Sequence, residues 1–319
     1  MQFGEKSGLK MGQATRDAFG DALKELGDKF PEVVTVDGDV GNSTRLEPFA
    51  QAYPQRAFNV GIAESNIVSV AAGLAATGKT PVAASFACFL LCNAYDQIRM
   101  SVAFPQMNVK LVGSHAGISI GEDGPSQMGI EDVALACSFP GVVVIVPCDA
   151  PSTRAATEAM LQHKGPTYLR LGRPKVPVVH ANDVKLVIGK SIQVRDGSDV
   201  TIIANGIMVA AALDAATELA AEKISVRVID MHTVKPIDEE AIVRAAKQTK
   251  GIVVAEEHLP TGGLGATVAS VVTRTVPTRM AYVNIGDRYA ESGDPDGLLQ
   301  KYGLTPQAVA SAARGLLKS

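Results

Sequence analysis

Short β-branched segments alternate with Ala-rich segments of helical length along the whole chain. A first series of this kind fills the first half, and a second series follows it. Such alternation is typical of parallel sheets whose two faces are covered by helices. The predicted strands are residues 33–37, 57–60, 81–85, 109–113, 142–146 and 167–171, then 199–204, 226–230, 252–256 and 280–285.

Helices are predicted in the intervals between these strands. Pro151 comes just after Asp149 and suits a first helical turn, where its missing N–H costs nothing. Thr305 followed by Pro306 predicts an N-cap and a proline at the first helical position. The predicted helices cover residues 15–26, 64–76, 94–102 and 151–163, then 208–221, 238–247, 266–274 and 306–317.

The stretch RPKVPVVHAND, residues 173–183, interrupts the alternation. Its prolines deny hydrogen bonds to a sheet, and polar residues follow, so we predict a linker there. We therefore expect an α/β protein with two doubly wound domains, residues 1–178 and residues 179–319.

The composition is consistent with two domains and argues against nucleic-acid binding, membrane insertion and export. The 319 residues are 46% hydrophobic, and 30 Lys and Arg against 33 Asp and Glu give a net charge of −3, so no basic field attracts nucleic acid. The apolar runs of the chain, such as residues 142–146, are all far shorter than the ~20 residues that span a bilayer. The amino-terminal region carries charges and lacks the apolar core of a secretory signal. We predict a cytoplasmic protein that binds neither membrane nor nucleic acid.

The four cysteines are Cys88, Cys92, Cys137 and Cys148. Their spacing fits neither a disulfide framework nor a zinc site. We predict buried thiols in a reducing compartment, and no metal site.

A Gly-rich, acidic segment, GSHAGISIGEDGPSQMGIED (residues 113–132), follows a predicted strand. Loops at the carboxyl ends of parallel strands are where α/β proteins bind ligands. A long surface turn has a similar composition. Because His115, Glu122, Asp123 and Gln127 crowd into it, we interpret the segment as a candidate site.

Two other strand ends carry candidate ligand groups. Glu64 opens a predicted helix, where the helix dipole alone favours a carboxylate. A functional role requires a dehydrated, protonated carboxyl that donates a hydrogen bond to a ring nitrogen. Phe86 and Phe89 follow another strand, where they form either a stacking wall for a planar ring or ordinary core packing.

Cations and hydroxyls also lie near predicted strand ends and helix starts. These are Arg16, Ser43, His115 and Arg173. If they converge, they make an anion pocket, because the planar fork of Arg suits a phosphate. Taken singly, each is typical of a solvated surface.

The segment TGGLG, residues 261–265, is a weak match to a dinucleotide-binding fingerprint. Val268 occupies the place of the third glycine, and the remaining chain is short for a dinucleotide fold. A tight turn is therefore favoured over nicotinamide binding.

Taken together, these segments resemble the carboxyl-terminal part of transketolase, from about Gly12 to Leu317. The resemblance implies a pyrimidine-binding domain followed by the family's C-terminal domain, whereas the family's amino-terminal domain, with its GDG motif for Mg²⁺ and diphosphate, has no match. The matching motifs are DGD-x-x-NST (37–44), N-x-GIAE-x-N (59–66), FA-x-F-x(5)-YDQIRMS (86–101), GSHAGISIGEDGPSQMGIEDVA (113–134), YLRLGRP (168–174) and VRVIDMHTVKPID (226–238).

The resemblance implies thiamine diphosphate as cofactor and transfer of a two-carbon ketol unit from a ketose phosphate to an aldose phosphate, as in the pentose phosphate pathway. Glu64 matches the glutamate that hydrogen-bonds the aminopyrimidine. The matched cofactor positions are Asp39, Glu64, Phe86 and Phe89; the matched sugar-phosphate positions are Arg16, Ser43, His115, Asp123 and Arg173; Glu64, His115 and Gln127 are the implied catalytic positions.

One position departs from the family: Asn93 stands where members often carry Arg, which leaves room for a specialised ketose phosphate. The resemblance also implies a partner chain that holds the diphosphate with Mg²⁺ or Ca²⁺, and a homodimer of this chain within a heterotetramer. Glu257 and His258 of the second domain are candidates for reaching the site.

Three other functions stay open at this point. The β subunit of a 2-oxo acid dehydrogenase shares both domains, although GEDGPSQ and the anion-site positions favour a sugar. A non-catalytic scaffold subunit is the alternative from another class, and the intact Glu64 and Phe86 argue against it. A nicotinamide-dependent dehydrogenase is the most distant.

Overall fold

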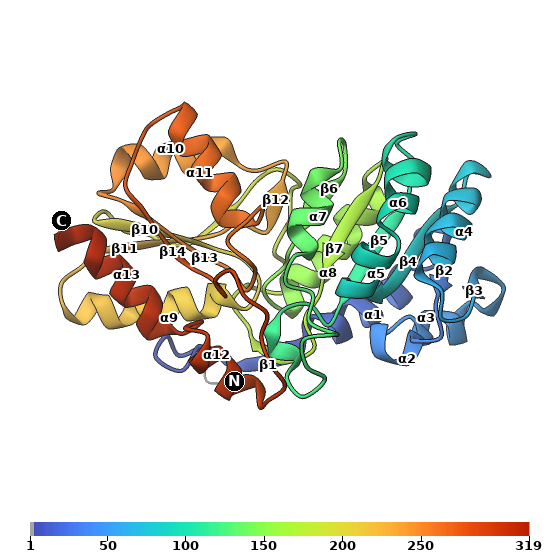
Figure 1. Ribbon diagram of the computed structural model, residues 1–319, viewed down its shortest axis with the longest axis horizontal. Coiled ribbons are helices and arrows are strands. Elements are labelled where there is room, and N and C mark those ends of the chain that lie inside the picture. The colour runs from blue at the N-terminus through green and yellow to red at the C-terminus, as the bar shows by residue number, and fades with distance from the viewer. Residues whose placement is uncertain (1–2, 319) are drawn as a thin grey trace.

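The computed structural model describes residues 3–318 and contains two parallel-dominated sheets side by side. Figure 1 shows the sheet from the first half of the chain on the right and the sheet from the second half on the left, each with helices on both faces. The α/β class and the doubly wound arrangement predicted from the sequence are confirmed. Among the described residues, no helix has the length and apolar character that a bilayer crossing requires.

The larger sheet has seven strands, parallel except for one edge strand. Its central strands are buried on both faces, which is why they read as continuous apolar runs. In spatial order the strands are β12 (Thr233–Lys235), β6 (Val143–Ile145), β7 (Thr167–Arg170), β5 (Lys110–Ser114), β4 (Thr80–Phe86), β2 (Val33–Asp37) and β3 (Ala57–Asn59).

Two helix layers cover this sheet. On one face, Ala84 and Leu169 pack under α1 and α8; on the other face, Ala83 and Tyr168 pack under α4, α5 and α7. The alternation of neighbouring residues between the two layers follows from the pleat of the strands. The bounds are α1 (Thr15–Leu26), α8 (Ala150–Gln162), α4 (Glu64–Ala76), α5 (Ala87–Asn93) and α7 (Asp132–Ser138).

The smaller sheet has five strands, and β9 is antiparallel to the others. Helices α9, α12 and α13 cover one face, and α10 and α11 cover the other (Figure 1). In spatial order the strands are β14 (Met280–Val283), β13 (Ile252–Ala255), β10 (Val200–Ala204), β11 (Val226–Asp230) and β9 (Ile192–Arg195); the helices are α9 (Met208–Ala221), α10 (Glu239–Gln248), α11 (Leu264–Arg274), α12 (Pro295–Lys301) and α13 (Pro306–Lys318).

Short helical turns complete the chain. The predicted helix 94–102 is wrong in its start, because the helical region already begins with α5 and continues through a π-helical segment. The cap predicted at Thr305 is confirmed, because Thr305 Oγ1 accepts the Ala308 N–H. The Asp149 carboxylate also caps α8, by accepting the Ser152 N–H. The short elements are α2 (Gly41–Thr44), α3 (Glu47–Ala52), η1 (Pro54–Arg56), α6 (Tyr95–Gln97), η2 (Ile98–Ala103) and η3 (Ile118–Ile120).

Three structural features correct the sequence analysis. The predicted linker contains β8 (Lys175–Pro177), which pairs with β1 (Met11–Ala14); proline is tolerated there because each strand of this pair has a single neighbour. Strand β12 comes from the second half of the chain but joins the first sheet beside β6. The four cysteines are free, yet Cys92 is exposed and Cys137 is half-buried, so the prediction of four buried thiols is wrong.

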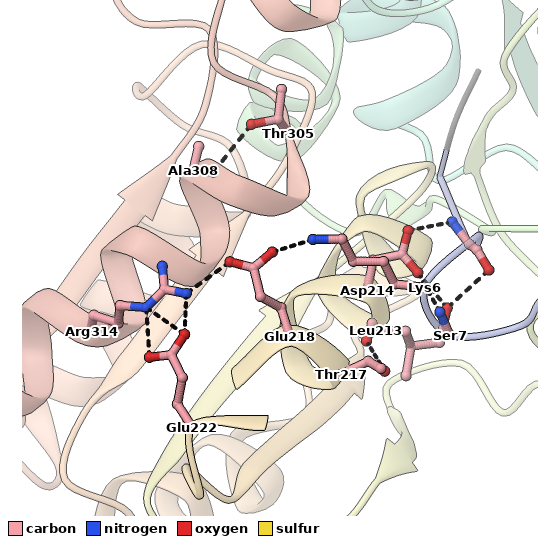
Figure 2. Close-up of polar contacts among 11 residues, drawn as sticks. Lys6, Ser7, Leu213, Asp214, Thr217, Glu218, Glu222, Thr305, Ala308 and Arg314 are labelled. Atoms are coloured by element: carbon pink, nitrogen blue, oxygen red, sulfur yellow. Dashed lines mark hydrogen bonds and ion pairs between the residues drawn. The ribbon is translucent and has the colours of Figure 1, made fainter. Parts of the chain in front are cut away.

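The amino-terminal segment is anchored to the second half. The Asp214 carboxylate of α9 accepts hydrogen bonds from the backbone N–H groups of Gly4 and Ser7, at 2.7 and 2.8 Å. Figure 2 shows Lys6 pointing to Glu218 on the same helix, while Arg314 of α13 joins Glu218 to Glu222. These bonds hold the start of the chain against α9, although predicted domain 1–178 includes it. The boundary at residue 178 remains a prediction.

A buried ion pair joins the two halves. Arg170 at the end of β7 donates to the Asp132 carboxylate at 2.8 Å, and the Tyr168 hydroxyl donates to the same oxygen at 2.7 Å. The guanidinium also donates to the carbonyl oxygens of Gly129 and Glu257. Its donors therefore reach the start of α7, the loop after β5 and the second domain at once.

We expect Asp132→Asn to lower the free energy of unfolding by about 3 kcal/mol or more, because it leaves the Arg170 charge buried without its counter-ion. Denaturant titration measures this loss. The matched control Asp287→Asn, at an exposed position, should change stability by about 0.5 kcal/mol or less. Equal effects of the two substitutions would contradict this account.

Candidate active site at the carboxyl edge of the first sheet

Five neighbouring parallel strands deliver candidate groups to one edge of the seven-stranded sheet. Asp39 follows β2, Glu64 follows β3, Phe86 ends β4, His115 follows β5 and Arg173 follows β7. The carboxyl ends of parallel strands meet at one edge, so residues far apart in the sequence converge there.

Glu64 is the first residue of α4, at the helix end where a carboxylate is favoured. Its Oε1 accepts a hydrogen bond of 3.0 Å from the Ser85 hydroxyl, which belongs to β4 directly before Phe86. The side chain is half-buried in this chain. The dehydration expected from the sequence is therefore not provided by this chain alone.

Three rings form a stacked wall beside this acid. Phe86 and Phe89 have ring centroids 5.8 Å apart and planes inclined by 11°. The His115 ring stacks on Phe86 at 3.9 Å and 13°. Phe89 is half-buried, so part of its ring remains accessible. The two phenylalanines thus form a wall at a strand end.

His115 links the wall to the cations. Its backbone has a positive φ of 57°, a conformation that costs a non-glycine residue energy and is typical of functional sites. Its Nε2 lies 2.6 Å from Arg16 Nη1, and its Nδ1 lies 2.8 Å from Ser114 Oγ. Because a guanidinium only donates, Nε2 is the acceptor and the ring proton is on Nδ1.

The imidazole is held neutral. Burial, followed by the positive charges of Arg16, Arg173 and Arg45, lowers the pKa of His115 to about 3. Burial also lowers the pKa of Arg16, partly offset by the neighbouring Asp17 carboxylate. These cations share one small region, so an anion that enters it relieves their mutual repulsion.

The guanidinium of Arg16 has spare capacity for a ligand. Its Nη1 also donates to the Ser43 carbonyl oxygen at 3.3 Å. Its Nε is buried and has no hydrogen-bond partner among residues 3–318. The Asp17 carboxylate lies 3.7 Å from this Nε, within ion-pair range but too far for a hydrogen bond, so a ligand or water would be needed to satisfy the donor. Arg16 and His115 are therefore brought together at a point suited to an anion, whereas Ser43 joins them through its carbonyl oxygen rather than its hydroxyl.

The segment 113–132 contributes a second charged pair. Arg173 Nη1 lies 3.2 Å from the Asp123 carboxylate and 3.3 Å from the Ile120 carbonyl oxygen. Both side chains are partly exposed. Gln127 is half-buried; its side-chain oxygen accepts from the neighbouring Ser126 hydroxyl, and its carbonyl oxygen accepts from the Cys88 thiol at 3.2 Å.

Asp39 lies to one side of the other groups. It is exposed, has a positive φ of 65° and accepts a hydrogen bond from Asn59 at 3.2 Å. A cavity of about 590 Å³ lies next to it. Its lining includes Asp37, Asp39, Asn42, Glu47, Phe58 and Asn59, and does not include Glu64, Phe86 or His115. Glu64 and the aromatic wall thus do not line this cavity.

The segment TGGLG forms a helix start whose donors are already used. The backbone N–H groups of Leu264 and Gly265 each donate to the Glu256 carboxylate at 2.7 Å. A Cβ at Gly263 would lie 2.3 Å from the same carboxylate. The place that a pyrophosphate takes in a dinucleotide fold is occupied by Glu256, which supports the turn predicted from the sequence.

Cys148, His180 and Asp230 form a buried group with ligand-type atoms within 4.8 Å of one another. Sequence spacing did not reveal it, because the three come from separate segments. His180 Nε2 lies 2.8 Å from Asp230 Oδ2. Ligands around tetrahedral zinc, with bonds of about 2.0 Å, lie about 3.3 Å apart, so this spacing is that of a hydrogen bond.

Glu257 and His258, considered as possible contributors from the second domain, turn inward. Both are buried; Glu257 accepts the Ser119 N–H at 2.6 Å, and His258 Nε2 accepts the Ala134 N–H at 3.3 Å. They hold first-domain backbone and do not line the edge.

The sequence analysis missed Ser85 and Ser114, which orient Glu64 and His115. Ser85 immediately precedes the FA-x-F motif, and Ser114 is the second residue of the motif that begins GSHAG. Their positions beside the strand ends could have indicated this role.

These features define an α/β protein with a candidate ligand site at a sheet edge, where a cluster of cations adjoins an acid and a wall of aromatic rings. Comparisons identify the family. The transketolase pyrimidine-binding domain matches residues 11–179, and the transketolase C-terminal domain matches residues 189–309. The chain therefore belongs to the transketolase family.

Its relatives include chains of two lengths. It is 42% identical over 299 residues to a 6-deoxy-6-sulfo-D-fructose transketolase subunit from Clostridium sp. strain MSTE9, covering 93% of this chain and 92% of that protein. Human transketolase is 40% identical over 308 residues, which cover 95% of this chain and 49% of that enzyme. A solved structure, described as a split gene transketolase, inactive beta4 tetramer, superposes with a TM-score of 0.91 at 45% identity over 96% of this chain and 99% of that one.

We expect His115 to remain neutral, with its proton on Nδ1, from pH 8 to pH 5. The folded-state pKa lies below the ordinary value of 6.5, so the unfolded chain binds this proton first and the contribution to stability falls as pH drops below 6.5. Nitrogen-15 NMR of the histidine rings measures the state.

His180 serves as the internal comparison in the same spectra. Burial opposes its charge, but the hydrogen bond and charge of Asp230 raise the pKa of His180 overall. His180 should therefore titrate above His115. A His115 ring that protonates at or above pH 5.5 would contradict the geometry described here.

Proposed function

We propose that this chain is a subunit of a thiamine-diphosphate-dependent transketolase that moves a two-carbon ketol unit from a ketose phosphate to an aldose phosphate. The observation that supports it is the unbroken series of contacts from Glu64 through Ser85 and the Phe86 ring to His115 and Arg16. It sets an acid, an aromatic wall and an anion pocket side by side, as a ring cofactor and a phosphorylated sugar require.

The edge suits the aminopyrimidine half of the cofactor. A flat ring that contains nitrogen needs a stacking surface and a hydrogen-bonding acid, and the half-buried Phe89 and Glu64 offer both. When bound, thiamine diphosphate supplies the carbanion chemistry that breaks a carbon–carbon bond. Glu64 would hold and exchange a proton at its carboxyl, Phe86 and Phe89 would orient the ring, and Asp39 would lie toward its far end.

The chain needs a second polypeptide to close this site. Glu64 is only half-buried, and the neighbouring Ile62 and Phe58 are 79% and 41% exposed, which leaves apolar surface beside the acid. We propose that an N-terminal transketolase subunit covers it and holds the diphosphate with Mg²⁺ or Ca²⁺, within a heterotetramer that contains a dimer of this chain. The structurally similar split-gene tetramer is described as inactive, which supports a missing partner.

The cationic groups are proposed to bind the anionic end of the sugar. Arg16 and the neutral His115 lie together beside the Ser43 carbonyl oxygen, which supports this role. The Asp123 carboxylate, paired with Arg173, is proposed to accept a hydrogen bond from a sugar hydroxyl. The Clostridium relative is named for a sulfosugar, and Asn93 replaces a cation that members often carry. A ketose with an unusual anionic end is therefore a specific second candidate. A reducing cytoplasm, typical for free thiols, is the proposed location.

We expect Glu64→Ala to abolish two-carbon transfer in enzyme reconstituted with its N-terminal partner, Mg²⁺ and thiamine diphosphate, a loss of about 10³-fold or more, because the variant lacks the acid at the cofactor ring. The measurement is product formation from ketose phosphates, from a sulfo-deoxy ketose and from 2-oxo acids. Glu32→Ala, at an exposed acid of the same domain, is the matched control.

Full activity of the Glu64 variant would refute the assignment. Turnover of 2-oxo acids alone would favour the β subunit of an oxo acid dehydrogenase. If the wild-type enzyme turns over none of these donors although this chain still binds the partner subunit, the scaffold alternative would be favoured. Circular dichroism of the variant checks that the loss is not due to unfolding.

We expect the isolated chain to bind thiamine diphosphate weakly, with a dissociation constant above about 1 mM, because the pyrimidine edge alone supplies few contacts for a charged diphosphate. Titration calorimetry with and without the partner subunit measures the difference. Tight stoichiometric binding by this chain alone would count against a shared site.

A further inference from the structure

The loop that carries Asp123 belongs to the first domain in sequence, but its apolar side chains pack against the second domain. Its apolar side chains lie in the same buried cluster as residues of α9 and α12. Figure 1 shows α12 beside this loop, at the lower centre of the molecule. The shared cluster includes Ile118, Ile120, Met128 and Ile130 from the loop, with Met208, Leu298 and Leu299 from the second domain.

Three glycines of this loop adopt positive φ, and the place of each missing Cβ is filled by a second-domain side chain. Gly117, Gly121 and Gly124 have φ of 83°, 86° and 83°. A Cβ on these glycines would lie, in the same order, 2.2 Å from the Glu257 carboxyl carbon, 2.8 Å from the Pro295 ring and 2.3 Å from Ser292 Oγ.

This repeated contact goes beyond ordinary packing. Real Cβ atoms do not approach other atoms so closely, so the backbone and the three side chains share one mutually fixed arrangement. Glu257 also accepts the Ser119 N–H within the loop. The loop is thus held from the second domain at its start, its middle and its tip.

The opposite side of the tip faces the anion pocket. Arg173 binds both the Asp123 carboxylate and the Ile120 carbonyl oxygen. Residues 121–124 therefore lie between Arg173 on the site side and the second-domain segment 292–295 on the other. Loss of contact on the second-domain side would let Asp123 move relative to the pocket.

We propose that the second domain positions the Asp123 loop for recognition of the sugar, and that Ser292 and Pro295 are positioning residues that act through Gly124 and Gly121. The role of Asp123 in binding a sugar hydroxyl rests on the proposed function. The fixing of the loop by these two side chains does not, and it is measured separately.

The test uses Ser292→Ala in the reconstituted enzyme. This change keeps the Cβ of Ser292 and removes the Oγ that overlies Gly124. Hydrogen–deuterium exchange of the amides of residues 121–127 should rise by about threefold or more, since the tip loses a packing partner. Ser292→Thr keeps an Oγ and should restore wild-type exchange. Ser311→Ala, at an exposed serine of α13, is the matched control.

Kinetics form the second arm. The KM of the ketose donor should rise by roughly tenfold in Ser292→Ala while kcat stays within about twofold, because a displaced Asp123 weakens substrate positioning more than the chemistry at Glu64. Ser292→Thr should restore the KM. Unchanged exchange would overturn the proposal, and so would a fall in kcat with an unchanged KM.

The two arms separate this proposal from the proposed function. If wild-type enzyme transfers no ketol unit, the proposed function fails, while the exchange measurement still decides whether Ser292 fixes the loop. If wild-type enzyme is active and the variant shows neither change, the positioning role is wrong and the proposed function stands.

Discussion

The buried pair of Arg170 and Asp132 is the interaction on which the arrangement of the site depends. Asp132 ends the Gly-rich loop, Arg170 ends a central strand, and the same guanidinium reaches a backbone carbonyl of the second domain. A charge with this little access to water is stable only when its partners are in place. The pair therefore couples closure of the loop to docking of the two domains, and the site is assembled when both have occurred.

Parallel strands explain why the chemistry gathers at one edge. Each strand turns toward its following helix at the same end of the sheet, so five short segments contribute an acid, aromatic rings and cations without any of them being close in sequence. Strain appears at the same edge: Asp39, Arg45 and His115 all adopt positive φ. Such conformations persist where surrounding contacts fix them, and here a neutral imidazole is held between a phenyl ring and a guanidinium.

Local pattern was enough to predict much of the fold. The parallel strands of both sheets and the cap at Thr305 follow from apolar periodicity and from a side chain that bonds its own helix start. The short strands β1, β8, β9 and β12 were missed because three or four residues carry little periodicity and their pairing is decided by distant segments. In the site, motifs located the groups, but the Ser85 bond to Glu64 and the anchoring of the loop by Ser292 depend on tertiary contacts.

Strand β12 has a consequence for how the molecule can be divided. It crosses from the second half to pair with β6, whose residues are fully apolar. A fragment cut between the two matched domains would leave β6 as an unprotected margin with unpaired amide groups, a template for intermolecular strand addition. The two family domains are thus separate in sequence but share one sheet, because β12 of the second domain completes the edge of the first. The two domains therefore depend on each other structurally.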